Sequence, residues 1–289
     1  MGLKQEQKKL EQNYEQEIMD ILVLLGDMGG GASGIIKGIW EPSVDMLAYL
    51  DLSTQELVKC KGWISWLAED KDRNGWIHHL ENKKIYHLKV RKRKQEKQNN
   101  TNNAFLLVEV VERNLDHPEL NKVLEEYEKP LVIEDELCGT FTLERRFGWF
   151  SGTIDWLGEK CSASLECDSE NEKQGEETAK GALHALHVIY KDLKEWDEKF
   201  RGFAAKRLTD LANDWLMDSE EFDEDEEEEE NENLITEEAF AERIWIGEIT
   251  ISPEGDYEAY YNDDDMFWGH VIIVSGNIET GIKDAEIAG

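Results

Sequence analysis

Residues 245–262 read WIGEITISPEGDYEAYYN and predict part of a sheet in the second half of the chain. Apolar or aromatic side chains recur among polar ones over residues 245–252 and 257–262, as in strands that bury one face. Pro253-Glu254-Gly255-Asp256 between them contains the residue types that favour a turn. The stretch therefore predicts two antiparallel strands joined by a short connection.

The flanking segments extend this hairpin into a mixed domain. Further strands are expected at residues 140–146, 150–156, 160–167 and 269–275. Helices are expected at residues 176–200, 203–216 and 237–243, with an interruption at Gly202. Strands, then helices, then strands indicate an α+β fold with an antiparallel sheet and two to three helices.

The first half predicts a helix followed by a small, mostly β domain. Leu10, Tyr14, Ile18, Ile21 and Leu25 recur at spacings of three and four, which indicates a helix over residues 3–25. Strands are expected at residues 35–40, 45–50, 57–67, 76–80, 85–90 and 105–111, with a turn at Arg73-Asn74-Gly75 and a helix at 118–127. This pattern is typical of a small curled sheet or barrel.

The sequence thus predicts three parts. They are an N-terminal helix with a Gly-rich connector (1–34), a small β-rich domain (35–130) and an α+β domain (131–289) with an acidic insertion at 219–233. Within that insertion, ten of the eleven residues from Glu220 to Glu230 are acidic, which predicts a solvated loop or disordered spacer, with a docking or cation-binding tail as the alternative.

Charge excludes several classes of function. The 289 residues carry 65 acidic and 32 basic side chains, a net charge of -33. Residues 1–136 account for -6 of it, and residues 137–289 for -27. Such a charge repels phosphates and anionic lipids, so it argues against a general nucleic-acid or membrane binder and favours solubility, cation binding or a basic protein partner.

Other sequence patterns narrow the possibilities further. No apolar run approaches the length of a bilayer span, and the N-terminus lacks a secretory signal. The four scattered Cys predict a reducing, cytoplasmic location. The Gly-rich residues 26–34 match no phosphate-binding pattern, and His184 and His187 lack a third ligand at metal spacing, so no cofactor, metal site or catalytic residue is predicted.

Clustered acids and aromatics single out a candidate binding region. Asp263, Asp264 and Asp265 end a predicted strand, and Trp268 and His270 follow. On another predicted strand the candidates are Trp149, Asp155 and Trp156. Aromatics beside acids can recognise a basic partner, or they can be core side chains at the end of the sheet. The acids and His270 also permit a metal-assisted enzyme site.

A basic patch in the first half is the exception to the acidic composition. It lies within residues 83–97 and contains Lys89, Arg91, Lys92, Arg93 and Lys94. It can contact the phosphates of nucleic acid, or it can pair with acids of the same chain at the end of a strand.

The second half contains several distinctive motifs: Cys138-Gly139-Thr140-Phe141-Thr142-Leu143, Phe147-Gly148-Trp149-Phe150-Ser151-Gly152, Ile154-Asp155-Trp156, Ile235-Thr236-Glu237-Glu238-Ala239-Phe240, Ile249-Thr250-Ile251, Asp265-Met266-Phe267-Trp268-Gly269-His270 and the tail from Gly281 to Gly289. These motifs resemble those of the DUF2262 family of bacterial proteins of unknown function. The resemblance covers roughly residues 137–289. It implies an α+β domain of bacterial cytosolic proteins, similar to small acidic immunity and interaction domains, and it brings no established activity.

Together these observations predict a non-enzymatic, acidic, cytoplasmic binding protein that docks a protein partner, such as a toxin that it neutralises. The alternative is a metal-assisted enzyme with its site in the segment from Asp263 to His270. A homodimer through the N-terminal helix is also compatible with the sequence.

Overall fold

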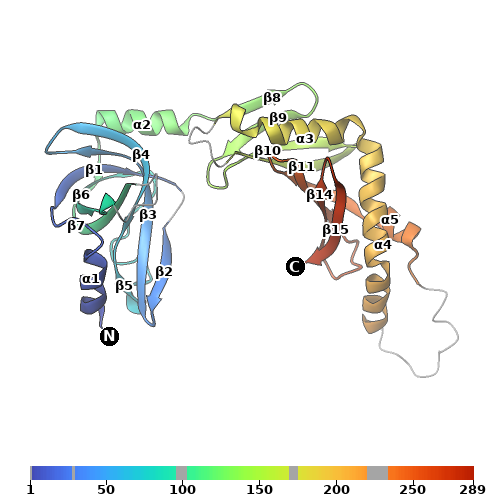
Figure 1. The fold of residues 1–289 in the computed structure, drawn as a ribbon, viewed down its shortest axis with the longest axis horizontal. Coiled ribbons are helices and arrows are strands. Elements are labelled where there is room, and N and C mark those ends of the chain that lie inside the picture. The colour runs from blue at the N-terminus through green and yellow to red at the C-terminus, as the bar shows by residue number, and fades with distance from the viewer. Residues whose placement is uncertain (1, 28–29, 96–102, 169–174, 220–233) are drawn as a thin grey trace. The chain divides into compact units, whose positions relative to one another are not determined.

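The computed structural model describes residues 2–27, 30–95, 103–168, 175–219 and 234–289 (Figure 1). The chain divides into two compact units, Met1–Lys129 and Pro130–Gly289. The acidic run from Glu220 to Glu230 lies outside the described residues, as does Lys97 of the basic patch. No helix in the described ranges is long and apolar enough to cross a membrane.

The N-terminal unit is mostly β structure. Its elements are α1 (Leu3–Glu11), β1 (Met19–Leu25), β2 (Gly31–Ile36), β3 (Ile39–Asp51), β4 (Glu56–Ser65), β5 (Ala68–Glu69), the 3-10 turn η1 (Asp70–Asp72), β6 (Ile85–Lys92), β7 (Asn103–Leu115) and α2 (Pro118–Glu128). The strands pair in the order β1-β6-β7-β4-β3-β2, and β1 also pairs with β3. This last pairing closes the sheet on itself, which confirms the predicted small curled sheet.

Helix α2 packs against part of this closed sheet. Pro118 opens the helix and His117 precedes it as the N-cap residue, so the predicted helix is confirmed. Leu120 and Val123 of α2 are buried with Leu24 and Ile85 of the strands. The helix therefore belongs to the core of the N-terminal unit.

The N-terminal helix is shorter than predicted. It ends at Glu11, and Met19–Leu25 is a strand that pairs with both β3 and β6. Ile21, Val23 and Leu25 also alternate with a period of two, and they are buried in the sheet. The pairing with two neighbours outweighs the helical spacing, and the predicted homodimer through this helix stays a prediction.

Two further predictions for the N-terminal unit are wrong. The Gly-rich segment is not only a connector, because β2 pairs with β3. Residues 76–80 form a turn rather than a strand, with positive φ at Trp76, Ile77 and His79. The indole N–H of Trp66 donates to the carbonyl of Trp76 at 2.8 Å. Trp76 thus lies beside the core as part of a turn.

The C-terminal unit is an α+β domain, as predicted. Its elements are β8 (Val132–Asp135), β9 (Gly139–Glu144), β10 (Trp149–Trp156), β11 (Glu159–Glu166), the 3-10 turn η3 (Glu176–Ala179), α3 (Lys180–Lys191), α4 (Leu193–Ser219), α5 (Glu237–Arg243), β12 (Trp245–Ile251), β13 (Asp256–Asn262), β14 (Val271–Asn277) and β15 (Gly281–Ala288). The sheet order is β15-β14-β13-β12-β11-β10-β9-β8.

The predicted hairpin of β12 and β13 lies at the centre of this sheet. Neighbouring strands are antiparallel except β11 and β12, which are parallel. A parallel pair requires a crossover, and α3, α4 and α5 supply it. Figure 1 shows α4 beside β14 and β15, and buried residues of α3, α4 and the strands form one core.

The helices break at a different place from the one predicted. The chain bends at Asp192 between α3 and α4, whereas Gly202 lies inside α4. Gly202 is exposed and a Cβ there would have no neighbour within 4 Å, so the helix continues through it on its solvent side. Strands β8 and β15 at the two edges were not predicted.

Candidate functional site

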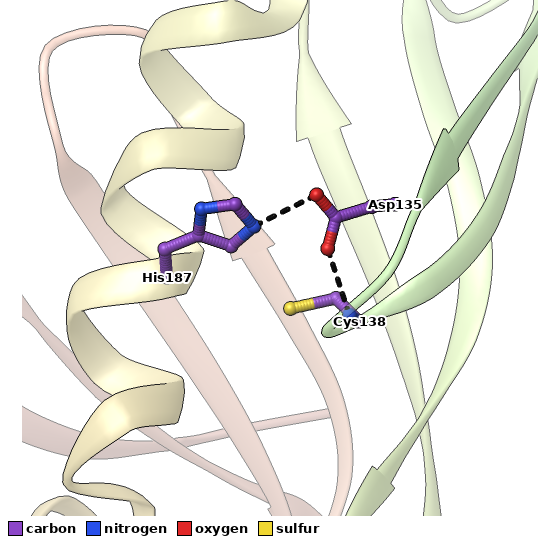
Figure 2. Close-up of side chains that lie close together, drawn as sticks. All are labelled: Asp135, Cys138 and His187. Carbon is purple, nitrogen blue, oxygen red and sulfur yellow. Dashed lines mark hydrogen bonds and ion pairs between the residues drawn. The ribbon is translucent and has the colours of Figure 1, made fainter.

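Three side chains of different chemistry meet at one edge of the C-terminal sheet (Figure 2). Asp135 ends β8, Cys138 lies in the turn before β9, and His187 projects from α3. Their potential ligand atoms all lie within 4.8 Å of one another. We call these three residues the Asp–Cys–His cluster.

The carboxylate of Asp135 organises the cluster. Its Oδ1 accepts hydrogen bonds from the backbone N–H groups of Leu137 at 3.0 Å and Cys138 at 2.8 Å, which shapes the turn. Its Oδ2 lies 2.9 Å from Nε2 of His187. Burial raises the pKa of Asp135, but these hydrogen bonds outweigh burial and bring the pKa below its ordinary value. The aspartate is therefore held in its charged form.

The thiol of Cys138 is protonated in this setting. The residue is only 4% exposed, and burial together with the nearby Asp135 carboxylate raises its pKa to about 12. A thiol with such a pKa is a poor nucleophile at neutral pH.

The geometry also differs from that of a nucleophilic triad. In a triad the two ring nitrogens of His face the nucleophile and the acid separately. Here Nε2 of His187 faces Asp135, and Figure 2 shows Nδ1 on the side of the ring away from both Asp135 and Cys138. Three donors around one point suit a metal ion better than they suit acyl transfer.

Sequence reasoning did not find this cluster. His187 was predicted to be an ordinary helix residue, and Asp135 and Cys138 were not singled out. The one local signal is an acid and a thiol three residues apart in a turn. His187 lies 52 residues beyond Asp135, and only the packing of α3 on the sheet brings it close.

The predicted candidate segment from Asp263 to His270 is a tight loop between β13 and β14. Asp263 is 5% exposed, and its carboxylate accepts hydrogen bonds from the backbone N–H groups of Asp265 at 3.3 Å, Phe267 at 2.7 Å and Gly269 at 3.1 Å. The backbone has positive φ at Asp264, Asp265, Trp268 and Gly269. Asp263 therefore stabilises an unusual backbone.

The other side chains of this loop point to separate partners. Asp264 accepts from the guanidinium of Arg243 at 2.6 Å, whereas Asp265 is exposed. Nδ1 of His270 lies 2.6 Å from the carbonyl of Phe267. The three carboxylates are not arranged around a common point.

Trp268 is the most exposed large apolar residue in the described part of the chain, at 64%. Its ring packs on Trp215 of α4, with 4.8 Å between the centroids. The two rings border a small pocket that Ile235, Arg243 and Met266 also line. We call the exposed side chains around this pocket, those of Arg243, Asp265 and Trp268, the Trp268 surface.

The remaining predicted binding residues lie elsewhere. Trp156 is buried, and its indole N–H donates to Asp197 at 2.9 Å. Asp155 accepts from the backbone N–H of Gly158. Trp149 lies at the other end of β10 from Trp156, where it is the strand partner of Glu166 on β11.

Trp149 and the Trp268 surface are separated by the length of the sheet. On β11 and β12, Leu165 lies opposite Ile251, whereas Trp245 and Asn262 lie at the other end of β12 and β13. The loop of Trp268 follows Asn262. The two aromatic groups therefore do not form one surface.

The basic patch of the N-terminal unit partly pairs with the chain itself. Lys89 forms an ion pair with Glu109 at 2.7 Å, and Lys94 donates to the carbonyl of Gln12 at 2.9 Å. Arg91 and Lys92 end β6, and the backbone of Arg93 forms an isolated antiparallel β-bridge with Tyr14. Binding of nucleic acid through this patch stays a prediction.

Two family models match the chain. DUF7021, a domain of unknown function, matches residues 6–127. DUF2262, described as an uncharacterized protein conserved in bacteria, matches residues 135–287. Comparison with curated proteins and with solved structures found no match. The DUF2262 match begins at Asp135, spans more than half of the chain and includes the motifs that carried the resemblance, the tail as far as Ile287. The chain therefore belongs to the DUF2262 family.

Proposed function

We propose that the C-terminal unit is a non-enzymatic docking module that binds a basic protein on its Trp268 surface in the cytoplasm. The observation that carries this proposal is the exposure of Trp268 on a loop whose shape is fixed by the buried carboxylate of Asp263. A toxin that the module neutralises would be a partner of this kind.

An exposed tryptophan on a fixed loop is well suited to binding. Tryptophan is enriched among the residues that contribute most to protein–protein affinity. The loop is already in its final shape, because Asp263 holds the backbone N–H groups of Phe267 and Gly269 and Trp215 supports the ring. A pre-ordered loop loses little conformational entropy on binding.

Backbone strain points to the same loop. Non-glycine residues at positive φ each cost about 1–3 kcal/mol, and such strain concentrates at functional sites. Asp264, Asp265 and Trp268 all adopt positive φ. The hydrogen bonds of Asp263 hold this strained conformation, in which a large apolar ring faces solvent.

Charge supports a basic partner. The C-terminal unit carries 43 acidic and 13 basic side chains, a net charge of -30, whereas the N-terminal unit has 22 and 19, a net charge of -3. A strongly acidic module attracts a basic protein over distance and disfavours acidic competitors. The affinity is therefore expected to fall with ionic strength.

Docking accounts for this loop better than a metal-assisted reaction does. The carboxylate of Asp263 accepts hydrogen bonds from backbone N–H groups, and the carboxylate of Asp264 accepts one from Arg243. A hard cation would have to displace these partners before it could be bound. We therefore do not assign a reaction to the segment from Asp263 to His270.

Co-purification from a bacterial host at low and high salt tests the proposal. The wild type is compared with Trp268→Ala and with Phe147→Ala, a matched control because Phe147 is also exposed but lies in the turn before β10. We expect one basic partner that the wild type and Phe147→Ala retain at low salt and that Trp268→Ala loses. A partner that all three retain equally, or none at all, would contradict the proposal.

A further inference from the structure

We propose that the Asp–Cys–His cluster binds a zinc-class divalent metal ion through the carboxylate of Asp135, the sulfur of Cys138 and Nε2 of His187. This site is separate from the Trp268 surface. It lies at the β8–β9 edge of the sheet, whereas the Trp268 surface lies between β13, β14 and the helices α4 and α5. Each proposal can therefore fail without the other.

The distances allow all three donors to reach one ion. Ligand atoms in a tetrahedral zinc site lie about 2.0–2.3 Å from the metal, and hence roughly 3–4 Å from one another. The donor atoms here lie within 4.8 Å of one another, with Nε2 of His187 at 2.9 Å from Oδ2 of Asp135. Side-chain rotations that move the donor atoms by about 1 Å would complete the tetrahedral arrangement. The backbone of the turn and of the helix would keep its position.

The donor types select the class of metal. Sulfur and imidazole favour zinc and related transition metals, whereas magnesium and calcium prefer oxygen alone. The backbone N–H groups of Leu137 and Cys138 hold Oδ1 of Asp135 on the side of Cys138, and Oδ2 faces Nε2 of His187. Hydrogen bonds of this kind orient a metal ligand and raise affinity.

The cluster is open to ions from solvent. The side chains of Asp135 and His187 are both partly exposed. Three protein ligands leave one tetrahedral position for water or another small ligand, as in zinc sites that are not purely structural. When the metal binds, the Cys138 thiol releases one proton to solvent, and the ring proton of His187 resides on Nδ1, which faces away from the site.

Cobalt substitution gives a readout specific to this site. Because the chain has 65 acidic side chains that can hold divalent ions without sulfur, total metal content does not decide the question. A thiolate bound to Co²⁺ instead produces a ligand-to-metal charge-transfer absorption band. We expect the full-length wild type, titrated with Co²⁺, to develop this band with one ion per chain and to lose it when Zn²⁺ is added.

Variants identify the ligands. Cys138→Ala and His187→Gln should lower the affinity for Co²⁺ by at least about 100-fold, because each removes a ligand. The matched controls are Cys167→Ala, which changes another free thiol, and His184→Gln, which changes an exposed His of the same helix. Both controls should keep the band.

Two results would overturn the site. One is the absence of a cobalt–thiolate band in the wild type, and the other is a band that Cys138→Ala and His187→Gln both retain. If circular dichroism shows that a variant does not fold, X-ray absorption of the zinc-loaded wild type decides. A shell with one sulfur and at least one imidazole nitrogen supports the site, and an all-oxygen shell contradicts it.

Discussion

The indole of Trp268 lies 4.8 Å from that of Trp215, between ring centroids, yet Trp268 remains 64% exposed. One face of the ring is thus supported by α4 while much of the side chain faces solvent. Burial of such a ring by a partner would contribute about 1.5–3 kcal/mol to binding. The contact between the two rings positions Trp268 without hiding it.

Replacement of Asp263 by Asn should release the loop that carries Trp268. The amide side chain cannot accept all three hydrogen bonds as a carboxylate does, so we expect Asp263→Asn to lower the free energy of unfolding by about 2–3 kcal/mol. Urea denaturation measures this change. The matched substitution Asp265→Asn, on an exposed neighbour, should change it by less than about 0.5 kcal/mol. Equal effects would contradict the role given to Asp263.

Replacement of Asp197 by Ala should be more costly, because it breaks a buried network. Asp197 accepts hydrogen bonds from Trp156 at 2.9 Å and Tyr261 at 3.2 Å, and it pairs with Arg201 at 2.5 Å. We expect Asp197→Ala to lower the free energy of unfolding by about 3–5 kcal/mol. Glu198→Ala, at an exposed position next to it, should change it by no more than about 0.5 kcal/mol. In the same urea titration, a loss for Asp197→Ala below about 1 kcal/mol, the net contribution of one hydrogen bond, would contradict the role of Asp197 in a buried network.

The stability of the N-terminal unit should fall as the pH drops below about 6.5, because of His78. Burial lowers the pKa of His78, and the charge of Arg113 lowers it further. Above that pH the imidazole is neutral in the folded and unfolded chains alike. Below it the unfolded chain binds a proton more readily than the folded one does, so unfolding is favoured.

Thermal unfolding of the wild type and of His78→Phe measures this effect. The pH is varied between about 7.5 and about 5, a range that brackets the ordinary pKa of His. Phe preserves an aromatic ring against Trp66, which lies 5.3 Å from His78 between ring centroids. The variant should lose part of the acid sensitivity of the wild type. Identical pH profiles would show that His78 does not contribute.

Much of the fold could be predicted where one pattern dominates. The strands around Pro253-Glu254-Gly255-Asp256 and the helix that Pro118 opens match their expected positions because turn residues and periodicity agree there. Residues 19–25 were predicted as helix because Ile18, Ile21 and Leu25 satisfy a helical spacing. Their strand structure depends on pairing with β3 and β6, which are distant in the sequence.

In the candidate sites, too, local sequence patterns predict some features, while others depend on contacts between distant residues. The loop from Asp263 to His270 stood out because acids and aromatics are adjacent in the sequence, but its hydrogen bonds depend on the backbone conformation. The Asp–Cys–His cluster joins a turn to a helix 52 residues away, and a single sequence contains no signal for that contact. Trp156 was a candidate surface residue, yet the register and helix packing bury it beside Asp197.

Thiol alkylation provides a separate check on the chemistry of the cluster. Burial raises the pKa of both Cys138 and Cys161 to about 12, so both should react slowly with iodoacetamide at neutral pH. Cys60 and Cys167 are only half-buried and should react sooner. Mass spectrometry of peptides from the briefly treated protein gives the order. Preferential labelling of Cys138 would instead indicate an activated nucleophile and contradict its assignment as a protonated thiol.

Site-specific photo-crosslinking in a bacterial host is the sharpest test of docking on the Trp268 surface. A photoreactive phenylalanine analogue is placed at the exposed residue 265, which borders the same pocket as Trp268, in one variant and at the exposed residue 147 in a second. Docking on the Trp268 surface predicts one discrete adduct with a basic protein from residue 265 and none from residue 147. No adduct at residue 265, or the same adducts from both positions, would contradict it.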